Sequence, residues 1–484
     1  MPTVALDLDG VNAMPGDLGP YREILDQVLL QNRPAYAFAA QKWADVEHWR
    51  TEARGKLHEL LAFRPRRTAL DSRVERSLVH DGLAIEEVSW EVGYGARCQG
   101  WVLRPATARG KLPAVLALHD HGGFKYYGKE KIAETDHAYP LTREHREKAY
   151  GGVPWANALA KQGYVVLVHD NFTFGSRSLP IDSLGERHQS RFAGLKPHSP
   201  ELIQAYNKWA GEHEHILAKS FFTAGTTWPG ILAFEDRRAV DYLCTRSDVD
   251  ADRIGCGGLS GGGLRTTFLA GLDSRIRAAV CIGFMSTWED FLHDKCYTHT
   301  WMLYVPGCSA ILDFPDILSL RAPLATLVQY DEDDPLYTLK GQRDAHAAIA
   351  RTYRETGASD RYVGSFYPGP HKFDQPMQTE AFEFLEAPVD LGGAPSALGK
   401  RISPLPDGTG CLCRTRRNDP LRRTAISLHR SEYLSARHPI CSTDVRGGRG
   451  GSASTVRIPG PRSRGRDGPH RPDAGVRPRG GCGR

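Results

Sequence analysis

The sequence predicts a layered α/β fold with a mostly parallel central sheet flanked by helices. Short apolar segments recur along the chain, as expected for strands buried on both faces. They lie at 113–120, 164–170, 253–260, 276–283 and 324–331. Helical spacing fills the segments between them, at 155–162, 231–246, 262–271 and 342–356. Strands that alternate with helices indicate parallel crossovers within one sheet.

The predicted α/β domain spans residues 84–388 and begins with a hairpin of strands at 84–93 and 98–105. Before it, residues 1–83 are predicted to form an N-terminal helical extension, because apolar residues there recur at a spacing of three and four. Inserts near 124–154, 172–228 and 285–321 interrupt the domain. Inserts of this length often form lids or substrate-binding elements.

The charge of the chain is uneven. Its 484 residues carry a net charge of +5, but residues 400–484 hold 19 Lys and Arg against 6 Asp and Glu. The rest is therefore acidic, which argues against a specific nucleic-acid surface. Residues 389–484 are rich in Gly, Pro, Ser and Arg and are predicted to be a disordered basic tail. Their Arg-Gly and Arg-Pro dipeptides would also fit a gene end read in a shifted frame, which resequencing would test.

The location of the protein is predicted to be cytoplasmic, with no membrane partner. The sequence contains no run of eighteen apolar residues, and the start M-P-T-V-A-L-D-L-D-G lacks a basic region followed by an apolar one. Six cysteines precede the tail and form no C-x-x-C pair, so they are interpreted as reduced thiols.

A glycine-rich turn at 253–263, R-I-G-C-G-G-L-S-G-G-G, supplies the candidate nucleophile. Gly258, Ser260 and Gly262 form G-x-S-x-G between an apolar strand and a helix. Such a strained strand-to-helix turn exposes a serine hydroxyl above the sheet, next to the positive end of the helix. Ser260 is thus the predicted nucleophile, and the amide of Gly261 is one predicted oxyanion donor. The alternative is a glycine-rich turn that only ends a strand.

The acid and the histidine of such a site should follow the serine in the chain. The strand L-A-T-L-V-Q-Y-D-E-D-D-P-L-Y ends in four acidic residues at 331–334. Asp334 is the preferred acid, because Pro335 stiffens the turn that aims it, and Asp333 is the second choice. A merely solvated acidic loop is the alternative. His371, in P-G-P-H-K-F after a strand at 361–367, is the predicted general base.

A second oxyanion donor is expected from the loop after an earlier strand. The sequence H-D-H-G-G at 119–123 follows the strand at 113–120. The backbone amide of His121 is the predicted donor. For His119 and Asp120, the alternative is that their polar groups only satisfy hydrogen bonds of the loop.

Together these motifs resemble the dienelactone hydrolase and acetyl xylan esterase branch of the α/β-hydrolases. The resemblance covers about residues 84–387 and rests on H-D-H-G-G, H-D-N-F-T-F-G-S-R, D-R-I-G-C-G-G-L-S-G-G-G, A-P-L-A-T-L-V-Q-Y-D-E-D-D-P-L-Y and P-G-P-H-K-F. It implies the α/β-hydrolase fold and cleavage of carboxylic esters, with acetylated carbohydrates a common substrate class. It also implies a triad at Ser260, Asp334 and His371, a small-molecule ester as substrate, and no cofactor or metal. Dienelactone hydrolases proper have cysteine in place of Ser260, so that specific activity is not carried over.

Two other functions stay open at this point. One is a peptidase or amidase of the prolyl oligopeptidase type, which shares the G-x-S-x-G-G pattern but usually carries a β-propeller, for which residues 1–83 are too short. The other is a non-catalytic binding protein that kept the fold.

Remaining motifs predict no metal site. Asp7 and Asp9 resemble the D-x-D-G of haloacid-dehalogenase-type phosphatases, but helices follow them instead of a phosphatase-sized α/β domain. His213 and His215 in G-E-H-E-H would point apart on a helix and are interpreted as part of a solvated face. Cys411 and Cys413 have no partners at zinc-binding spacing.

Overall fold

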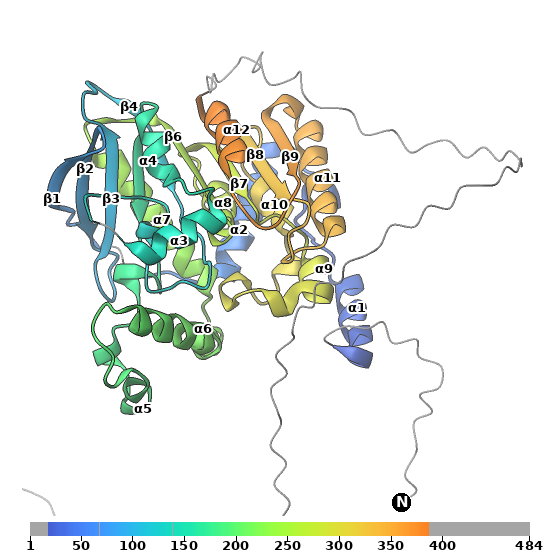
Figure 1. Cartoon of the computed structure of the whole chain (residues 1–484). Coiled ribbons are helices and arrows are strands. Elements are labelled where there is room, and N and C mark those ends of the chain that lie inside the picture. Colours follow the sequence, from blue (N-terminus) through green and yellow to red (C-terminus); the bar gives the residue numbers. More distant parts are fainter. Residues whose placement is uncertain (1–17, 67, 138, 387–484) are drawn as a thin grey trace, which may run out of the picture. The chain divides into compact units, whose positions relative to one another are not determined.

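The computed structural model describes residues 18–66, 68–137 and 139–386, in which nine strands form one sheet (Figure 1). The strands are β1 (Arg73–His80), β2 (Leu83–Trp90), β3 (Cys98–Pro105), β4 (Leu112–Ala117), β5 (Val165–His169), β6 (Val249–Leu259), β7 (Ile276–Ile282), β8 (Ala325–Asp331) and β9 (Tyr362–Tyr367). Their order is β1-β2-β3-β5-β4-β6-β7-β8-β9. Pairing is antiparallel from β1 through β3 to β5, and parallel from β5 to β9. The predicted mostly parallel α/β sheet is confirmed.

Burial on both faces explains why the central strands are continuous apolar runs. All five residues of β5 are buried. Val165 and Leu167 join the hydrophobic core on one face of the sheet, whereas Val166 and Val168 join the core on the other. Side chains alternate across a strand, so a strand covered on both sides needs apolar residues at every position.

The described residues form twelve α-helices. They are α1 (Arg22–Gln31), α2 (Val46–Leu61), α3 (Pro140–Ala149), α4 (Trp155–Lys161), α5 (Glu186–Gln189), α6 (Pro200–Thr223), α7 (Trp228–Thr245), α8 (Gly261–Leu272), α9 (Trp288–Asp290), α10 (Phe314–Ser319), α11 (Leu339–Glu355) and α12 (Gln375–Glu386). Helices α2, α7, α8, α10 and α11 bury their apolar faces in one core, and α4 and α12 bury theirs in the other. The helices therefore cover both faces, as parallel crossovers require.

Strand β1 lies inside the range 1–83 that the sequence assigns to a helical extension. Helices α1 and α2 do occupy the earlier part of that range, but the sheet begins at Arg73. The strand was missed because it pairs only with β2, at the edge of the sheet, and most of its residues are exposed. Val74 and Val79 are 55% and 70% exposed, so no alternation of buried apolar residues marks the strand.

Several expectations concern residues outside those described. They are the Asp7 and Asp9 motif, the disordered tail from 389 onward, and Cys411 with Cys413. Within the described part of the chain, no helix is both long and apolar enough to cross a membrane. The six cysteines found there are free thiols, four of them buried.

Candidate active site

Ser260 lies on a strained turn between β6 and α8. Its backbone φ is +58°, a left-handed conformation that residues other than glycine rarely adopt. The turn is held by a hydrogen bond of 2.9 Å from the Ser260 amide to the carbonyl of Ile282, at the end of β7. The side chain thus stands at the end of a central strand and the beginning of a helix.

The glycines around Ser260 let the end of β4 pass close to the turn. A Cβ atom on Gly258 or on Gly262 would lie 2.1 or 2.2 Å from the carbonyl oxygen of Leu118. No side chain tolerates such an approach, so the G-x-S-x-G spacing reflects packing of the turn against the neighbouring strand.

Asp334 and His371 meet where β8 and β9 end. The two loops are joined by hydrogen bonds between Asp333 and Gly369: the Asp333 amide donates to the Gly369 carbonyl at 3.1 Å, and the Gly369 amide donates to Asp333 Oδ2 at 2.9 Å. This brings His371 Nδ1 to 2.5 Å from Asp334 Oδ2. The other oxygen of Asp334 accepts from the Leu336 amide at 2.9 Å. Asp334 therefore contacts the imidazole, while Asp333 holds the loop that carries it.

The charges around His371 favour its protonated form. Burial would lower the pKa of His371, but the hydrogen bond to Asp334 and that carboxylate's charge outweigh it, and the pKa is raised. Asp331 lies nearby, where its Oδ2 accepts from the Lys372 amide at 3.1 Å. Burial raises the pKa of Asp331 to about 7, well above the 3.8 of an ordinary aspartate carboxyl group.

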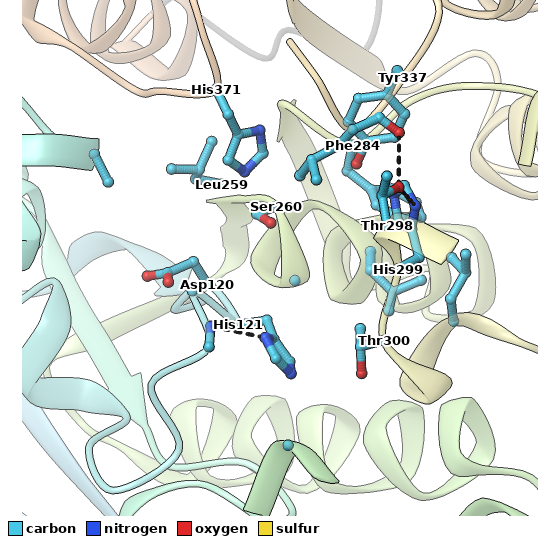
Figure 2. A pocket seen from close by; sticks show the side chains of 18 of the residues that line it. Asp120, His121, Leu259, Ser260, Phe284, Thr298, His299, Thr300, Tyr337 and His371 are labelled. Atoms are coloured by element: carbon cyan, nitrogen blue, oxygen red, sulfur yellow. Dashed lines mark hydrogen bonds between the residues drawn. The ribbon is translucent and has the colours of Figure 1, made fainter. Parts of the chain in front are cut away.

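One cavity of about 390 Å³ brings Ser260 and His371 together. Gly283 follows β7 with φ +53°, and a Cβ there would lie 3.2 Å from His371 Cε1 and 2.8 Å from Leu259 Cδ1. The imidazole therefore packs close to the turn that carries Ser260. Figure 2 shows His371 and His121 on opposite sides of Ser260 in the view. Among the described residues, the Ser260 hydroxyl makes no hydrogen bond.

All three predicted inserts contribute to the wall of this cavity. The contributing residues are His145 and Ala149 from the first insert, Gly211 and Glu214 from the second, and Thr298, His299, Thr300 and Leu303 from the third. His299 is held by a hydrogen bond of 3.0 Å between Nδ1 and the Lys295 carbonyl, and burial lowers its pKa to about 4. It is therefore neutral over the physiological pH range.

The two predicted oxyanion donors lie beside each other. A Cβ on Gly261 would be 2.7 Å from the backbone nitrogen of His121, so the glycine allows the loop 119–123 to approach the start of α8. In the described structure neither amide donates a hydrogen bond to another protein group. Two free N–H groups beside a serine at a helix N-terminus can stabilise developing negative charge.

Comparisons with known proteins agree with this architecture. No protein-family model matches the chain. The chain is 26% identical over 341 residues to the "Putative hydrolase YtaP" of Bacillus subtilis, which covers 70% of this chain and 99% of that protein. A "putative acetyl xylan esterase" from Bacteroides fragilis superposes with a TM-score of 0.55, at 17% identity, over 75% of this chain and 84% of that one. A glucuronoyl esterase from Solibacter usitatus superposes with a TM-score of 0.53, at 16% identity, over 74% and 98%.

The chain has the α/β-hydrolase fold. At the strand ends of this α/β-hydrolase sheet lie Ser260, Asp334 and His371, after β6, β8 and β9. The order of these residues in the chain is the one that the fold's serine enzymes use.

Glu214 of α6 is a buried residue of the cavity wall that sequence reasoning missed. Its Oε1 accepts from His121 Nε2 at 2.8 Å and lies 2.9 Å from Lys125 Nζ. Its Oε2 accepts from Thr300 Oγ1 at 2.5 Å and from the Trp301 amide at 3.1 Å. Burial alone would raise the pKa of Glu214, but the charges of Lys125 and His121 lower it. The carboxylate thus joins the loop 119–123 to the second and third inserts.

The two histidines that flank Glu214 in G-E-H-E-H contact different groups, as their positions on a helix predict. His213 stacks on Trp209, with ring centroids 4.8 Å apart, and His215 Nδ1 bonds to the Glu212 carbonyl at 2.8 Å. The motif G-E-H-E-H drew attention to its two histidines, whereas the glutamate between them is the residue that faces the cavity. A charged residue flanked by histidines gives no signal of burial in the sequence.

Among the described residues, one cluster of three side chains is close enough together to hold a metal ion. The ligand atoms of Asp331, Asp334 and His371 lie within 4.8 Å of one another. His371 Nδ1 and Asp334 Oδ2 already contact each other, and Asp331 Oδ2 accepts from the Lys372 amide, whereas Asp331 Oδ1 is buried without a hydrogen-bond partner.

Proposed function

We propose that the chain is a serine esterase that cleaves carboxylic esters, of the acetyl esterase type, with Ser260 as nucleophile, His371 as general base and Asp334 as the acid behind it. The observation that carries this proposal is the 2.5 Å contact between Asp334 and His371 at the cavity that also contains Ser260. A carboxylate on Nδ1 holds the proton there and leaves Nε2 free to accept one.

In the first step, Ser260 Oγ attacks the ester carbonyl carbon while His371 Nε2 takes the hydroxyl proton. The imidazolium that forms is stabilised by Asp334. The negative charge of the tetrahedral intermediate falls on the former carbonyl oxygen, which the amides of Gly261 and His121 bind. The C–O bond then breaks, the alcohol leaves with the proton from His371, and the acyl group stays on Ser260.

The second step repeats this chemistry with water. His371 removes a proton from water, whose oxygen attacks the acyl carbon. The second tetrahedral intermediate collapses, Ser260 recovers its proton from His371, and the carboxylic acid leaves. Each proton taken is returned, so the cycle consumes one water per ester.

Three further observations support an ester, and a short acyl group, as the substrate. Solved structures that share the fold carry the names acetyl xylan esterase and glucuronoyl esterase, and the Bacillus relative is named a hydrolase. Leu264, Phe284 and Leu303 line the cavity near Ser260 and offer an apolar surface for an acyl chain. A cavity of about 390 Å³ shared by acyl group and alcohol leaves little room for a long chain.

The test is a panel of p-nitrophenyl esters of increasing acyl length, with aminoacyl p-nitroanilides as amide substrates. We expect acetate to be cleaved fastest and amides slowly. Ser260→Ala should lower kcat by ~10⁴–10⁶-fold, whereas the exposed Ser183→Ala should have no effect. Adding a chelator should leave the rate unchanged.

Covalent labelling separates the alternatives. A fluorophosphonate should label the wild type and not Ser260→Ala. Labelling with faster amide than ester cleavage would favour the peptidase. A wild type that is neither labelled nor active would favour a binding protein and overturn the proposal.

A further inference from the structure

Lys131 is a buried lysine directly behind the loop 119–123, which carries the proposed oxyanion donor His121 and is called the oxyanion loop below. It ends the short 3₁₀ helix Lys129–Lys131 in the first insert, and its side chain is 0% exposed. Its Nζ donates hydrogen bonds to the backbone carbonyls of Asp120 and His121, the latter at 3.2 Å. Burial of an ammonium group costs free energy, so a lysine at such a position must make interactions that offset this cost.

The remaining surroundings of Lys131 leave it no contact with a substrate. Its Nζ lies 4.7 Å from the centre of the Phe174 ring and 3.6 Å from Asp120 Oδ2. Lys131 is not among the described residues that line the cavity around Ser260. Its action on the site therefore passes through the loop it holds.

The geometry of a peptide bond shows what that hold does. The carbonyl of Asp120 and the amide of His121 belong to the same planar, trans peptide group, so they point in opposite directions. Fixing the carbonyl toward Lys131 aims the His121 N–H away from the lysine. His119 Nδ1 lies 3.0 Å from the same carbonyl oxygen and fixes it further.

Polarisation acts in the same direction as orientation. A cation that bonds to a carbonyl draws electron density from the whole peptide group, which makes its N–H a stronger donor. The His121 amide, which would bind the oxyanion, belongs to the peptide that Lys131 polarises.

We propose that Lys131 is a positioning residue that aims and strengthens the oxyanion donor of His121. This inference rests on the proposed esterase function and names a further residue for it. Lys131 is held in a buried charged cluster whose other members facing it are Asp120, Lys125, Arg265, His119 and His121. Burial lowers the pKa of Lys131 to about 8, against the opposing charge of Asp120. Deprotonation above that pH should weaken the donor and slow the reaction.

The same 3₁₀ helix offers a matched control. Lys129 is also buried, but its Nζ bonds to Asp170 at 2.8 Å and Glu130 at 2.7 Å and does not contact the oxyanion loop. Replacing it removes a buried lysine two residues away without touching the His121 peptide.

The experiment compares wild type, Lys131→Met, Lys131→Arg and Lys129→Met with p-nitrophenyl acetate from pH 6 to 9.5. We expect Lys131→Met to lower kcat by about 10- to 100-fold with KM within about twofold. The inhibition constant of phenylboronic acid, which forms a tetrahedral adduct with an active serine, should weaken by a similar factor. Lys129→Met should change neither in a protein that remains folded, as judged by its Tm.

Lys131→Arg keeps the proposal testable if the methionine variant does not fold. Arginine stays charged far above pH 8, so the fall in kcat near that pH in the wild type should disappear. The proposal is overturned if Lys131→Met and Lys129→Met lower kcat equally, if only KM rises, or if Lys131→Arg keeps the fall near pH 8. Absence of Ser260-dependent activity in the wild type would instead overturn the proposed function.

Discussion

The two sides of the cavity are built by different physical means. On one side, Ser260, Asp334 and His371 follow the ends of strands, and the hydrogen bonds of the sheet and between the loops after β8 and β9 position them. On the other side, His121 is held by Glu214 and Lys131, which come from inserts and are themselves buried charges. The strand-end side depends on the fold, whereas the insert side depends on ion pairs that the fold does not require.

This difference has an energetic consequence. Asp334 is also buried, but its partner His371 can give up its proton when that charge is removed, so the loss of Asp334 should affect chemistry more than stability. Removing one partner of a buried ion pair leaves the other uncompensated and costs about 3–5 kcal/mol. Variants on the insert side should therefore lose stability and activity together. Four variants or measurements test this contrast.

Asp334→Asn should have the largest effect. The asparagine amide would favour the wrong tautomer of His371, so kcat should fall by ~10³–10⁴-fold with little change in Tm. Asp333→Asn is the matched control, because an asparagine oxygen can still accept from the Gly369 amide. Steady-state kinetics with p-nitrophenyl acetate measure both. A larger loss in Asp333→Asn than in Asp334→Asn would reverse our assignment of the acid.

Glu214→Gln tests the insert side. The amide oxygen can still accept from His121, but the charge opposite Lys125 is lost. We expect kcat to fall by about 10-fold and Tm to fall with it. Glu212→Gln, which removes an exposed charge two residues earlier on α6, should change neither. Equal effects in the two variants would show that Glu214 has no special role.

The pH dependence of kcat/KM reports on the strand-end side. In the proposed mechanism only the neutral imidazole of His371 accepts the serine proton, and its pKa is raised above the ordinary 6.5 by Asp334 against the effect of burial. Activity should therefore be lost as the pH falls through a value above 6.5. A profile with its acid midpoint below 6 would contradict the described environment of His371.

Asp331→Asn should have the smallest effect on activity, and its main effect should be on the free energy of unfolding. The carboxyl of Asp331 has a pKa of about 7 in the folded state, because burial disfavours its charge, and an ordinary value near 3.8 when unfolded. The folded state thus loses stability as the pH rises from about 4 to about 7. Asparagine mimics the protonated form, so the variant should gain about 4 kcal/mol relative to wild type at pH 8 and about 1 kcal/mol at pH 4.5. Thermal unfolding at both pH values would show this, and an equal difference at both would refute it.

The strand-end side could be predicted from the sequence to a large extent. The apolar runs at β4 to β8 predict parallel strands, and glycines around Ser260 mark the turn, because both patterns follow from local packing. The order of serine, acid and histidine follows from the topology. The preference for Asp334 over Asp333 rests on Pro335 and on the family resemblance, and the contact with His371 agrees with it.

The insert side could not be predicted in the same way. Lys131 and Glu214 look like surface residues in the sequence, since lysine and glutamate are usually exposed. Their burial depends on contacts between segments far apart in the chain, such as Glu214 with Thr300. Strand β1 was missed for a related reason: its exposed valines carry no pattern, and only pairing with β2 defines it.

The most direct test of the account is a crystal structure of the protein after reaction with a phosphonate ester. We predict phosphorus bonded to Ser260 Oγ, with one phosphonyl oxygen about 2.7–3.1 Å from the amides of both Gly261 and His121. Phosphorus on another residue, or a phosphonyl oxygen turned away from these amides, would contradict the account.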